Sequence, residues 1–390
     1  MEDRSRDRYG GLSSRELWFW LSTLDVIGPV SLNRLLGVFG SPEGIWTHHA
    51  WSGADAWNGD HDMPCVELKP KQIKELGDSK LEPEKIAKKL AAIEKDGIAF
   101  IGRNEADFPD KLRSLPDCPA GLFVKGSLPM PDMPMVAIVG ARSCDEYGRQ
   151  MAEYFGRELA SHGIGVVSGM AAGIDGESQW AALRSGGYSL AVLGSGVDIC
   201  YPRSNYNLYE QLIRDGGVVS ENVPGTIPQA FRFPMRNRLV SAFSDAVLVV
   251  EARERSGSLI TADHALEQGR DVMAVPGRVG DQLSEGCNRL IRQGAVMVTC
   301  FEDVCEVLGM DFSEQKNFRE AEDEERKDHD AEWMKIIEAL SSTPSHIDNI
   351  SEKTGIAISE LMHDLLLMEM RGMVRQVCQG QYVKLLFPDR

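Results

Sequence analysis

The sequence has no Cys-x-x-Cys pair, and its eight cysteines form no cluster with histidine at the spacing of a zinc site. This pattern argues against a structural metal site and against a disulfide framework. Scattered free thiols are typical of the reducing cytoplasm, where we expect the protein to reside. The cysteines are Cys65, Cys118, Cys144, Cys200, Cys287, Cys300, Cys305 and Cys378.

Long apolar runs are also missing. No stretch approaches the ~18 uncharged apolar residues that a membrane helix needs. The first eleven residues alternate charges and have no apolar core of a signal peptide. We therefore expect a cytoplasmic protein without a membrane partner.

The common catalytic and cofactor motifs are absent. The sequence contains no Gly-x-Ser-x-Gly, no His-Glu-x-x-His and no phosphate-binding Walker A motif. The dinucleotide motif Gly-x-Gly-x-x-Gly is missing as well, because Arg142 stands where the third-position glycine would let a pyrophosphate approach. His162, His264, His346 and His363 lie far apart in the sequence without a motif partner. We predict a protein that is not an enzyme and that holds no cofactor or metal.

Lysine is absent between Ala141 and Cys300, although this segment contains fifteen arginines. A guanidinium group stacks on bases and pairs with phosphate through two hydrogen bonds, which an ammonium group cannot imitate. The net charge of −17 argues against a protein that covers duplex DNA over a wide surface. Any nucleic-acid site is therefore local and built from arginine.

The hydrophobic pattern divides the chain into four parts. Residues 12–95 have a helical pattern in which Gly28-Pro29 separates two apolar helices, as in a SAM-like or helix-hairpin-helix domain. Packing of a helical bundle and contact with a DNA backbone both fit this pattern, and we favour packing because Arg34 is the only base nearby. Residues 311–330 hold nine acidic and four basic residues, which predicts a solvated linker.

Residues 96–310 are expected to form the core. Short Val, Ile, Leu and Ala runs alternate with amphipathic helical segments, which predicts a mainly parallel sheet covered on both faces. This is an extended Rossmann-like, doubly wound α/β fold. The expected parallel strands lie at 136–139, 165–167, 190–193, 218–219, 246–250, 272–275 and 295–298.

Residues 331–390 are expected to fold as a winged helix. The pattern predicts helices over 331–340, 347–354 and 359–371, followed by a hairpin that turns at Gln379-Gly380. The third helix occupies the position of a recognition helix, but it is acidic and strongly apolar, whereas a reader of the DNA groove needs outward bases and amides. We therefore predict a protein-docking or regulatory module.

The most unusual clusters follow the predicted strands. Ligands of an open α/β sheet bind beyond the carboxyl ends of its strands, where glycine turns and helix N-termini present N–H groups to anions. We expect five glycine-bearing loops to form one anion-binding crevice. Asp175 and Ser258 have a structural alternative as helix N-caps. The five loops begin at Gly140, Ser168, Gly194, Glu251 and Pro276.

The segment Phe231–Arg238 interleaves two aromatic rings, three arginines and an amide. Phosphate pairing together with base stacking is what binding of a single strand requires. The alternative is a loop whose rings belong to the core and whose arginines pair with acids. Together with the strand-end loops, this segment predicts a DNA site of Gly140, Arg142, Ser143, Ser168, Gly169, Gly173, Arg232, Phe233, Arg236, Asn237, Arg238, Gly257 and Ser258.

With these motifs in this order, the chain resembles the DprA/Smf family of bacterial DNA-processing proteins. The resemblance implies a Rossmann core that forms a homodimer, holds single-stranded DNA in a basic pocket, protects incoming DNA and loads RecA during natural transformation. It also implies that Arg142 grips DNA and that Arg236 and Arg238 belong to a Pro-x-Arg-Asn-Arg motif. The stretches that carry the resemblance are 138–142, 168–175, 201–205, 233–238, 256–261, 276–277 and 285–291.

Two positions depart from the family pattern. Ala172 stands where the family usually has lysine or arginine, and Gln179 stands where it usually has histidine. The loss of one phosphate contact predicts weaker binding and a flatter salt dependence. Arg203 and Arg232 are candidates to compensate.

Two other functions fit a Rossmann-like crevice. A phosphoribohydrolase would carry Pro-Gly-Gly-x-Gly-Thr and a catalytic glutamate, but the corresponding strand end here is Arg255–Thr261. A nucleotide-sensing regulator would use a small ligand to control the winged helix, and would leave the segment Phe231–Arg238 without a role. Both stay as alternatives to DNA binding.

Overall fold

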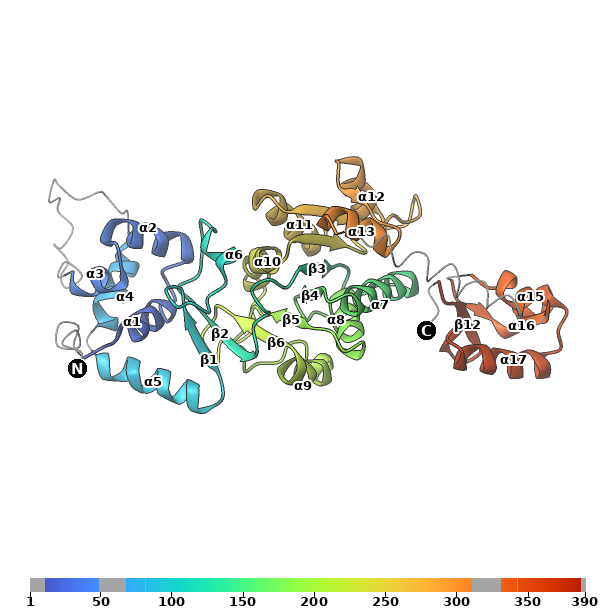
Figure 1. Ribbon diagram of the computed structural model, residues 1–390, viewed down its shortest axis with the longest axis horizontal. Helices are drawn as coiled ribbons and strands as arrows, with labels where there is room; N and C mark the ends of the chain where they lie inside the picture. Colours follow the sequence, from blue (N-terminus) through green and yellow to red (C-terminus); the bar gives the residue numbers. More distant parts are fainter. Residues whose placement is uncertain (1–10, 49–67, 81, 311–330, 342, 387–390) are drawn as a thin grey trace.

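The computed structural model describes residues 11–48, 68–80, 82–310, 331–341 and 343–386. In Figure 1 the N-terminal helices lie at one end, the large sheet lies in the middle and the winged helix lies at the other end. The predicted linker 311–330 lies outside the described residues.

Five described helices precede the sheet: α1 (Ser14–Ser22), α2 (Pro29–Phe39), α3 (Pro42–Thr47), α4 (Pro70–Ser79) and α5 (Pro83–Lys95). Four of them begin with proline, whose fixed φ suits the first helical position. The first helix instead begins with a capping box between Ser13 and Glu16.

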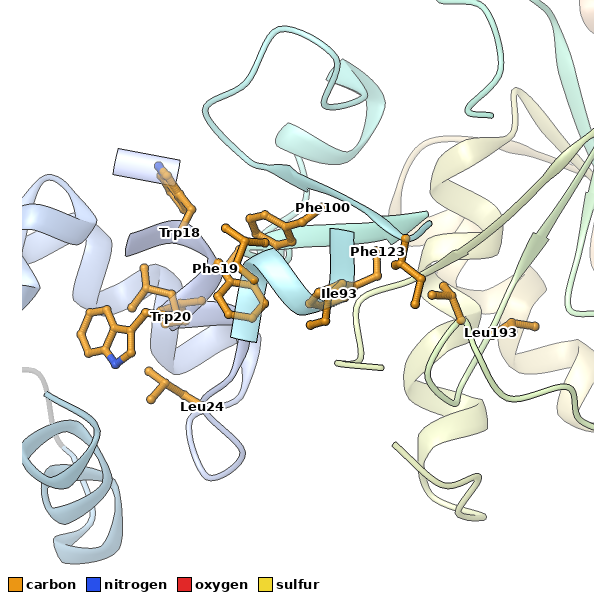
Figure 2. Close-up of a cluster of buried hydrophobic side chains, with 14 of the residues drawn as sticks. Trp18, Phe19, Trp20, Leu24, Ile93, Phe100, Phe123 and Leu193 are labelled. Carbon is orange, nitrogen blue, oxygen red and sulfur yellow. The ribbon is translucent and has the colours of Figure 1, made fainter. Parts of the chain in front are cut away.

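These helices share a hydrophobic core with the sheet. The ring of Phe19 lies 5.4 Å from that of Phe100 and 6.1 Å from that of Phe123, both edge to face (Figure 2). Trp20 is fully buried and packs edge to face on Trp46. The rings of Phe19, Trp20 and Trp46 therefore serve packing, which is the alternative that the sequence favoured.

The core is one nine-stranded sheet in the order β1-β2-β6-β5-β4-β3-β7-β8-β9. The seven strands from β6 to β9 in this order run parallel, as predicted, and β1 and β2 pair antiparallel at one edge. The strands are β1 (Ala99–Gly102), β2 (Gly121–Gly126), β3 (Met135–Val139), β4 (Gly165–Ser168), β5 (Ser189–Val192), β6 (Gly217–Ser220), β7 (Ala246–Val249), β8 (Asp271–Ala274) and β9 (Val296–Met297).

Helices cover both faces of this sheet. The first face packs against α7 (Glu146–Ser161), α8 (Ile174–Arg184), α9 (Tyr206–Asp215) and α13 (Phe301–Leu308). The second face packs against α6 (Asp110–Arg113), α10 (Arg232–Phe243), α11 (Gly257–Glu267) and α12 (Glu285–Arg292). The strand order reverses at β3, which lies between β4 and β7. This reversal is the position where an open α/β sheet places its ligand crevice.

The C-terminal part is the predicted winged helix. It contains α15 (Ala331–Ala339), α16 (Ile347–Thr354) and α17 (Ile358–Met370), and a small sheet of β10 (Ser345–His346), β11 (Val374–Cys378) and β12 (Gln381–Lys384). On α17, side chains such as Met362, Leu366 and Met370 are exposed, which fits the predicted apolar character of this helix.

The winged helix contacts the core through α7. The Arg375 guanidinium donates to both carboxylate oxygens of Glu153, at 3.2 and 2.8 Å, and lies 3.6 Å from Glu146. The Leu386 N–H donates to Oε1 of Gln150 at 3.0 Å. These contacts use the outward side of α7, next to the loop that follows β3.

Candidate nucleic-acid interface

A cleft of 620 Å³ opens at the carboxyl ends of the central strands. Its walls are the loops after β3, β4 and β7, together with the first turns of α10 and the ring of Tyr201. Nine of the predicted residues line it. They are Gly140, Arg142, Ser143, Gly169, Phe233, Arg236, Asn237, Gly257 and Ser258.

The loop after β3 carries the exposed side chains of Arg142 and Ser143. A Cβ at Gly140 would lie 2.6 Å from Cγ1 of Ile174, so only glycine fits at the start of this loop. The guanidinium carbon of Arg142 lies 5.4 Å from the ring centre of Phe233. This arrangement leaves Arg142 within reach of a phosphate while its flat face rests on an aromatic ring.

The loop after β7 adds two arginines that sequence reasoning did not select. Arg253 and Arg255 are exposed and line the cleft. The loop ends at Ser256, whose side chain accepts from the Ser258 N–H at 3.4 Å and caps α11. The expected N-cap role of Ser258 is therefore wrong, because the helix begins at Gly257, two residues before the expected start. The alternation Arg-x-Arg at a strand end was the signal that could have identified the pair.

The floor of the cleft holds a buried arginine, Arg236, and a buried acid, Asp175. Arg236 is 5% exposed and donates to the carbonyl oxygens of Gly169 and Val192. The buried carboxylate of Asp175 accepts from the Gly169 N–H at 3.1 Å. Burial raises the pKa of Asp175, and the charge of Arg236 opposes that rise. Burial lowers the pKa of Arg236 to about 10, so its guanidinium is charged at neutral pH.

Asp175 therefore does not cap its helix, contrary to the sequence-based expectation. The N-cap of α8 is Gly173, with a φ of 75° that L side chains rarely adopt. A Cβ there would also lie 2.3 Å from the carbonyl oxygen of Ala141. Gly173 thus allows the loops after β3 and β4 to pack closely together, and it does not line the cleft.

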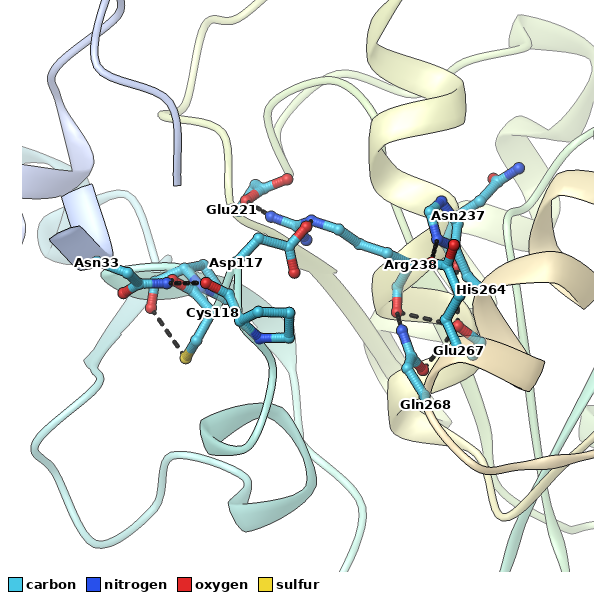
Figure 3. Close-up of polar contacts among 12 residues, drawn as sticks. Asn33, Asp117, Cys118, Glu221, Asn237, Arg238, His264, Glu267 and Gln268 are labelled. Carbon is cyan, nitrogen blue, oxygen red and sulfur yellow. Dashed lines mark hydrogen bonds and ion pairs between the residues drawn. The ribbon is translucent and has the colours of Figure 1, made fainter. Parts of the chain in front are cut away.

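Three further predicted residues point elsewhere. Ser168 is fully buried, and its hydroxyl donates to the carbonyl oxygen of Ile138 at 2.6 Å. Arg232 donates to the Asn222 side chain at 2.5 Å and faces a groove beside the N-terminal helices. Arg238 is 4% exposed and pairs with Asp117 at 2.7 Å and with Glu221 at 2.6 Å (Figure 3).

The expectation that five loops form one crevice is only partly met. The loops after β5 and β8 contribute none of their predicted glycines to the lining. Gly194 packs beneath the side chain of Phe233, because a Cβ there would lie 3.1 Å from that ring. Gly277 packs against Ser284, because a Cβ at Gly277 would lie only 2.0 Å from the Ser284 hydroxyl oxygen. Both glycines allow close packing, and the Gly277 N–H already donates to Oδ1 of Asn288 at 3.2 Å.

Two side chains hold the loop after β4 in place. Nδ2 of Asn205 donates to the carbonyl oxygens of Met170 and Ala171 at 3.1 and 3.0 Å. Gln179 accepts from the Met170 N–H at 3.1 Å, and its amide nitrogen donates to Ser189 and Leu190. The departure at Gln179 is therefore a fully buried structural amide. Asn205 was not selected from the sequence as a site residue.

A buried acid lies beneath the loop after β3. Glu251 is 3% exposed, and its carboxylate accepts from the Asp145 N–H at 3.3 Å. Burial, reinforced by the neighbouring Asp145 carboxyl, raises the pKa of Glu251 to about 8. A Cβ at Gly148 would lie 2.2 Å from the Glu251 carboxyl carbon, so α7 packs directly on this group.

The cleft is strongly cationic. Its lining includes four arginines and a single acid, Asp175, which is buried against Arg236. The lining includes neither histidine nor cysteine. In the described part of the chain, no group of three His, Cys, Asp or Glu side chains is arranged to hold a metal ion. None of the described helices has the length and apolarity that a membrane crossing requires.

A doubly wound sheet with an arginine-lined cleft at its strand-order reversal, joined to a winged helix, defines a class of Rossmann-like anion-binding proteins. The family model of DNA recombination-mediator protein A matches residues 99–309, and the DprA winged helix domain matches residues 320–380. The chain therefore belongs to the DprA/Smf family of DNA recombination mediators, and its role lies in DNA processing.

Individual relatives agree with this assignment. Protein Smf of Escherichia coli K12 is 36% identical over 303 residues, which cover 77% of this chain and 81% of that protein. The X-ray structure of DNA processing protein A from Streptococcus pneumoniae has a TM-score of 0.63 and 32% identity, covering 76% of this chain and 98% of that one.

A second similar structure is described by its binding mode. DNA processing protein A from Helicobacter pylori, reported with its single-stranded DNA binding mode, has a TM-score of 0.50 and 29% identity. The match covers 54% of this chain and 95% of that one.

Proposed function

We propose that this chain binds single-stranded DNA in the cleft, protects it and delivers it to RecA. The observation that carries the proposal is the lining of the cleft, where Arg142, Arg253 and Arg255 surround the buried Arg236. Guanidinium groups and backbone N–H groups at the start of α11 are the donors that phosphodiesters require. The Helicobacter relative, which is described as binding single strands, supports the same ligand.

The aromatic wall favours a single strand over a duplex. The half-buried ring of Phe233 lines the cleft, and Asn237 on the same helix offers an amide to a base edge. Stacking on such a ring requires an unpaired base, whereas the bases of a duplex are already stacked on one another. We propose Gly140, Arg142, Ser143, Gly169, Phe233, Arg236, Asn237, Gly257 and Ser258 as the predicted contacts, with Arg253 and Arg255 added from the structure.

The strand would be held by few phosphate contacts. The net charge of −17 repels DNA from most of the surface, so the bound segment is confined to the cleft. Arg253 and Arg255 are candidates to compensate for the basic residue that is missing at Ala172, because they line the cleft from the loop after β7, on the other side of β3 from the loop after β4.

The test is fluorescence anisotropy of the full chain with labelled single-stranded and duplex oligonucleotides of equal length, over a salt titration. We expect preference for the single strand and an affinity that falls steeply with salt. Equal affinity for duplex and single strand would contradict the proposal. Absence of binding at low salt, with binding of free nucleotides instead, would favour the nucleotide-sensing alternative.

The delivery step and the assembly have separate tests. The family resemblance implies that a cytoplasmic homodimer loads RecA, and light scattering of the purified chain measures the dimer directly.

To test loading, the DNA-dependent ATPase activity of RecA is followed on single strands that carry a single-strand-binding protein. We expect the chain to shorten the lag of this activity. If the protein binds DNA but leaves this lag unchanged, the delivery step is contradicted and the DNA-binding step is not.

A further inference from the structure

Three strand-end segments bring a tyrosine, a phenylalanine and an arginine together at one wall of the cleft. Tyr201 comes from the segment between β5 and the short 3-10 helix Arg203–Asn205, and Phe233 comes from the first turn of α10. Their ring centres lie 5.5 Å apart with the ring planes inclined by 27°, which is a stacked arrangement. The guanidinium of Arg142, from the loop after β3, lies 5.4 Å from the Phe233 ring centre.

The two rings differ in how they are held. Phe233 is half-buried, and the backbone at Gly194 packs closely against its ring. Tyr201 is 43% exposed and lines the cleft. Within the part of the chain that the structure describes, the Tyr201 hydroxyl makes no hydrogen bond. The exposed ring of Tyr201 therefore rests on Phe233 and is left open to the cleft.

The exposed ring of Tyr201 lines the cleft beside cationic side chains. Removing a ring from water is favourable in proportion to the apolar area that is buried, so a ligand that covers this ring gains free energy of binding. The cationic charge that would attract a phosphate, Arg142, contacts the same stack. A flat, partly apolar ligand group attached to a phosphate is the chemistry that satisfies both features.

We propose that Tyr201 is a base-stacking residue: one nucleobase of the bound strand stacks on its exposed ring and extends the Tyr201–Phe233 stack, while Arg142 holds a neighbouring phosphate. This inference rests on the proposed function and specifies how the cleft distinguishes an unpaired base. Stacking depends on the π face of the base and not on its hydrogen-bonding edge, so the site accepts any base.

The competing explanation is that Tyr201 only supports Phe233. Both explanations predict weaker binding when the ring is removed, but they differ in what the binding depends on. A base-stacking ring contributes only where a base is present, whereas a supporting ring contributes to every strand that contacts Phe233 or Arg142. Stacking also leaves the number of released counterions unchanged.

The experiment is a double-mutant cycle between the protein and the DNA, measured by anisotropy with the full chain. The protein variants are Tyr201→Ala, Tyr201→Leu and Tyr201→Phe, and the strands are oligo-dT and a strand of equal length with a central run of abasic sites. Tyr206→Ala is the matched control, because this tyrosine is 54% exposed and does not line the cleft.

We expect Tyr201→Ala and Tyr201→Leu to weaken oligo-dT binding about tenfold, with the salt slope of the wild type. Tyr201→Phe and Tyr206→Ala should bind like the wild type, and affinity for the abasic strand should change less than about twofold in every variant. Equal losses on both strands, or no loss on oligo-dT, would overturn the inference. If the wild type binds neither strand, the proposed function itself fails, which this design separates from a failure of Tyr201 alone.

Discussion

The floor and the rim of the cleft use the same residue type in opposite ways. On the floor, Arg236 is 5% exposed and is fixed by carbonyl oxygens; Arg238, which lies outside the cleft on the same helix, is 4% exposed and is fixed by two carboxylates. On the rim, Arg142, Arg253 and Arg255 are exposed, and the described residues hold no carboxylate partner for them. Arg142, Arg253 and Arg255 lie in loops that follow strands, whereas Arg236 and Arg238 lie on α10.

The difference teaches that a basic motif combines scaffold and ligand groups. A buried arginine with acid partners stabilises the fold because its removal leaves carboxylates without a counter-charge. An exposed arginine without partners adds little to stability, and its charge stays available to a ligand. Changes on the floor should therefore alter folding, and changes on the rim should alter binding.

The largest expected effect is at the buried Arg238, which lies on the same helix as Arg236 but outside the cleft. Arg238→Ala should lower the free energy of unfolding by about 3 kcal/mol, because Asp117 and Glu221 lose their shared counter-charge. Urea denaturation measures this loss. The control is Arg214→Ala, on the exposed end of α9 on the opposite face of the sheet, which should cost less than about 0.5 kcal/mol. Similar costs for the two variants would remove the distinction between buried, paired arginines and exposed ones.

On the rim, Arg142→Ala should weaken single-strand binding about tenfold and leave the unfolding free energy nearly unchanged. The loss corresponds to one charge-assisted phosphate contact, worth about 1.5 kcal/mol. The salt slope should flatten by about 0.7, the value for one phosphate on a single strand. Anisotropy over a salt titration measures both quantities, again with Arg214→Ala as the control. An unchanged affinity would remove Arg142 from the site.

The buried acid beneath the rim predicts a pH dependence. Because the pKa of Glu251 is raised to about 8 in the folded chain, from an ordinary value of 4.5, the unfolded state loses this proton at lower pH than the folded state. This group therefore makes the unfolding free energy fall as the pH rises from about 4.5 to about 8.

Glu251→Gln carries an amide that does not titrate, so it should remove the contribution of Glu251 to the fall of the unfolding free energy with pH. The variant should gain stability relative to the wild type as the pH is raised to 8. Urea denaturation at pH 5, 6.5 and 8 gives the difference between the two chains. A difference that is constant over this range would show that Glu251 titrates normally.

The smallest expected effect is that of the winged helix on DNA binding. Its described contacts with the core use Glu146, Gln150 and Glu153 of α7, none of which lines the cleft. A chain that ends at Asp330 should bind single strands with an affinity within about twofold of the full chain. A collapse of binding in the shortened chain would show that the winged helix belongs to the DNA site.

Local patterns were sufficient to predict the architecture. The seven parallel strands and the winged-helix elements were predicted within a few residues, because buried strands are near-continuous apolar runs and helices repeat every 3.6 residues. The position of the cleft followed from the rule for strand ends. The helix starts at Gly173 and Ser256 were missed because several residues near each start could serve as a cap.

The sequence by itself determined the fold class, the family and the segment of the chain in which arginines gather. Only the tertiary structure decided which of these arginines face a ligand. Arg236 and Arg238 are two residues apart on one helix, yet one lies beneath the cleft and the other pairs with Asp117 from a distant loop. Burial and charge pairing depend on residues far away in the chain, and no local pattern encodes such partners.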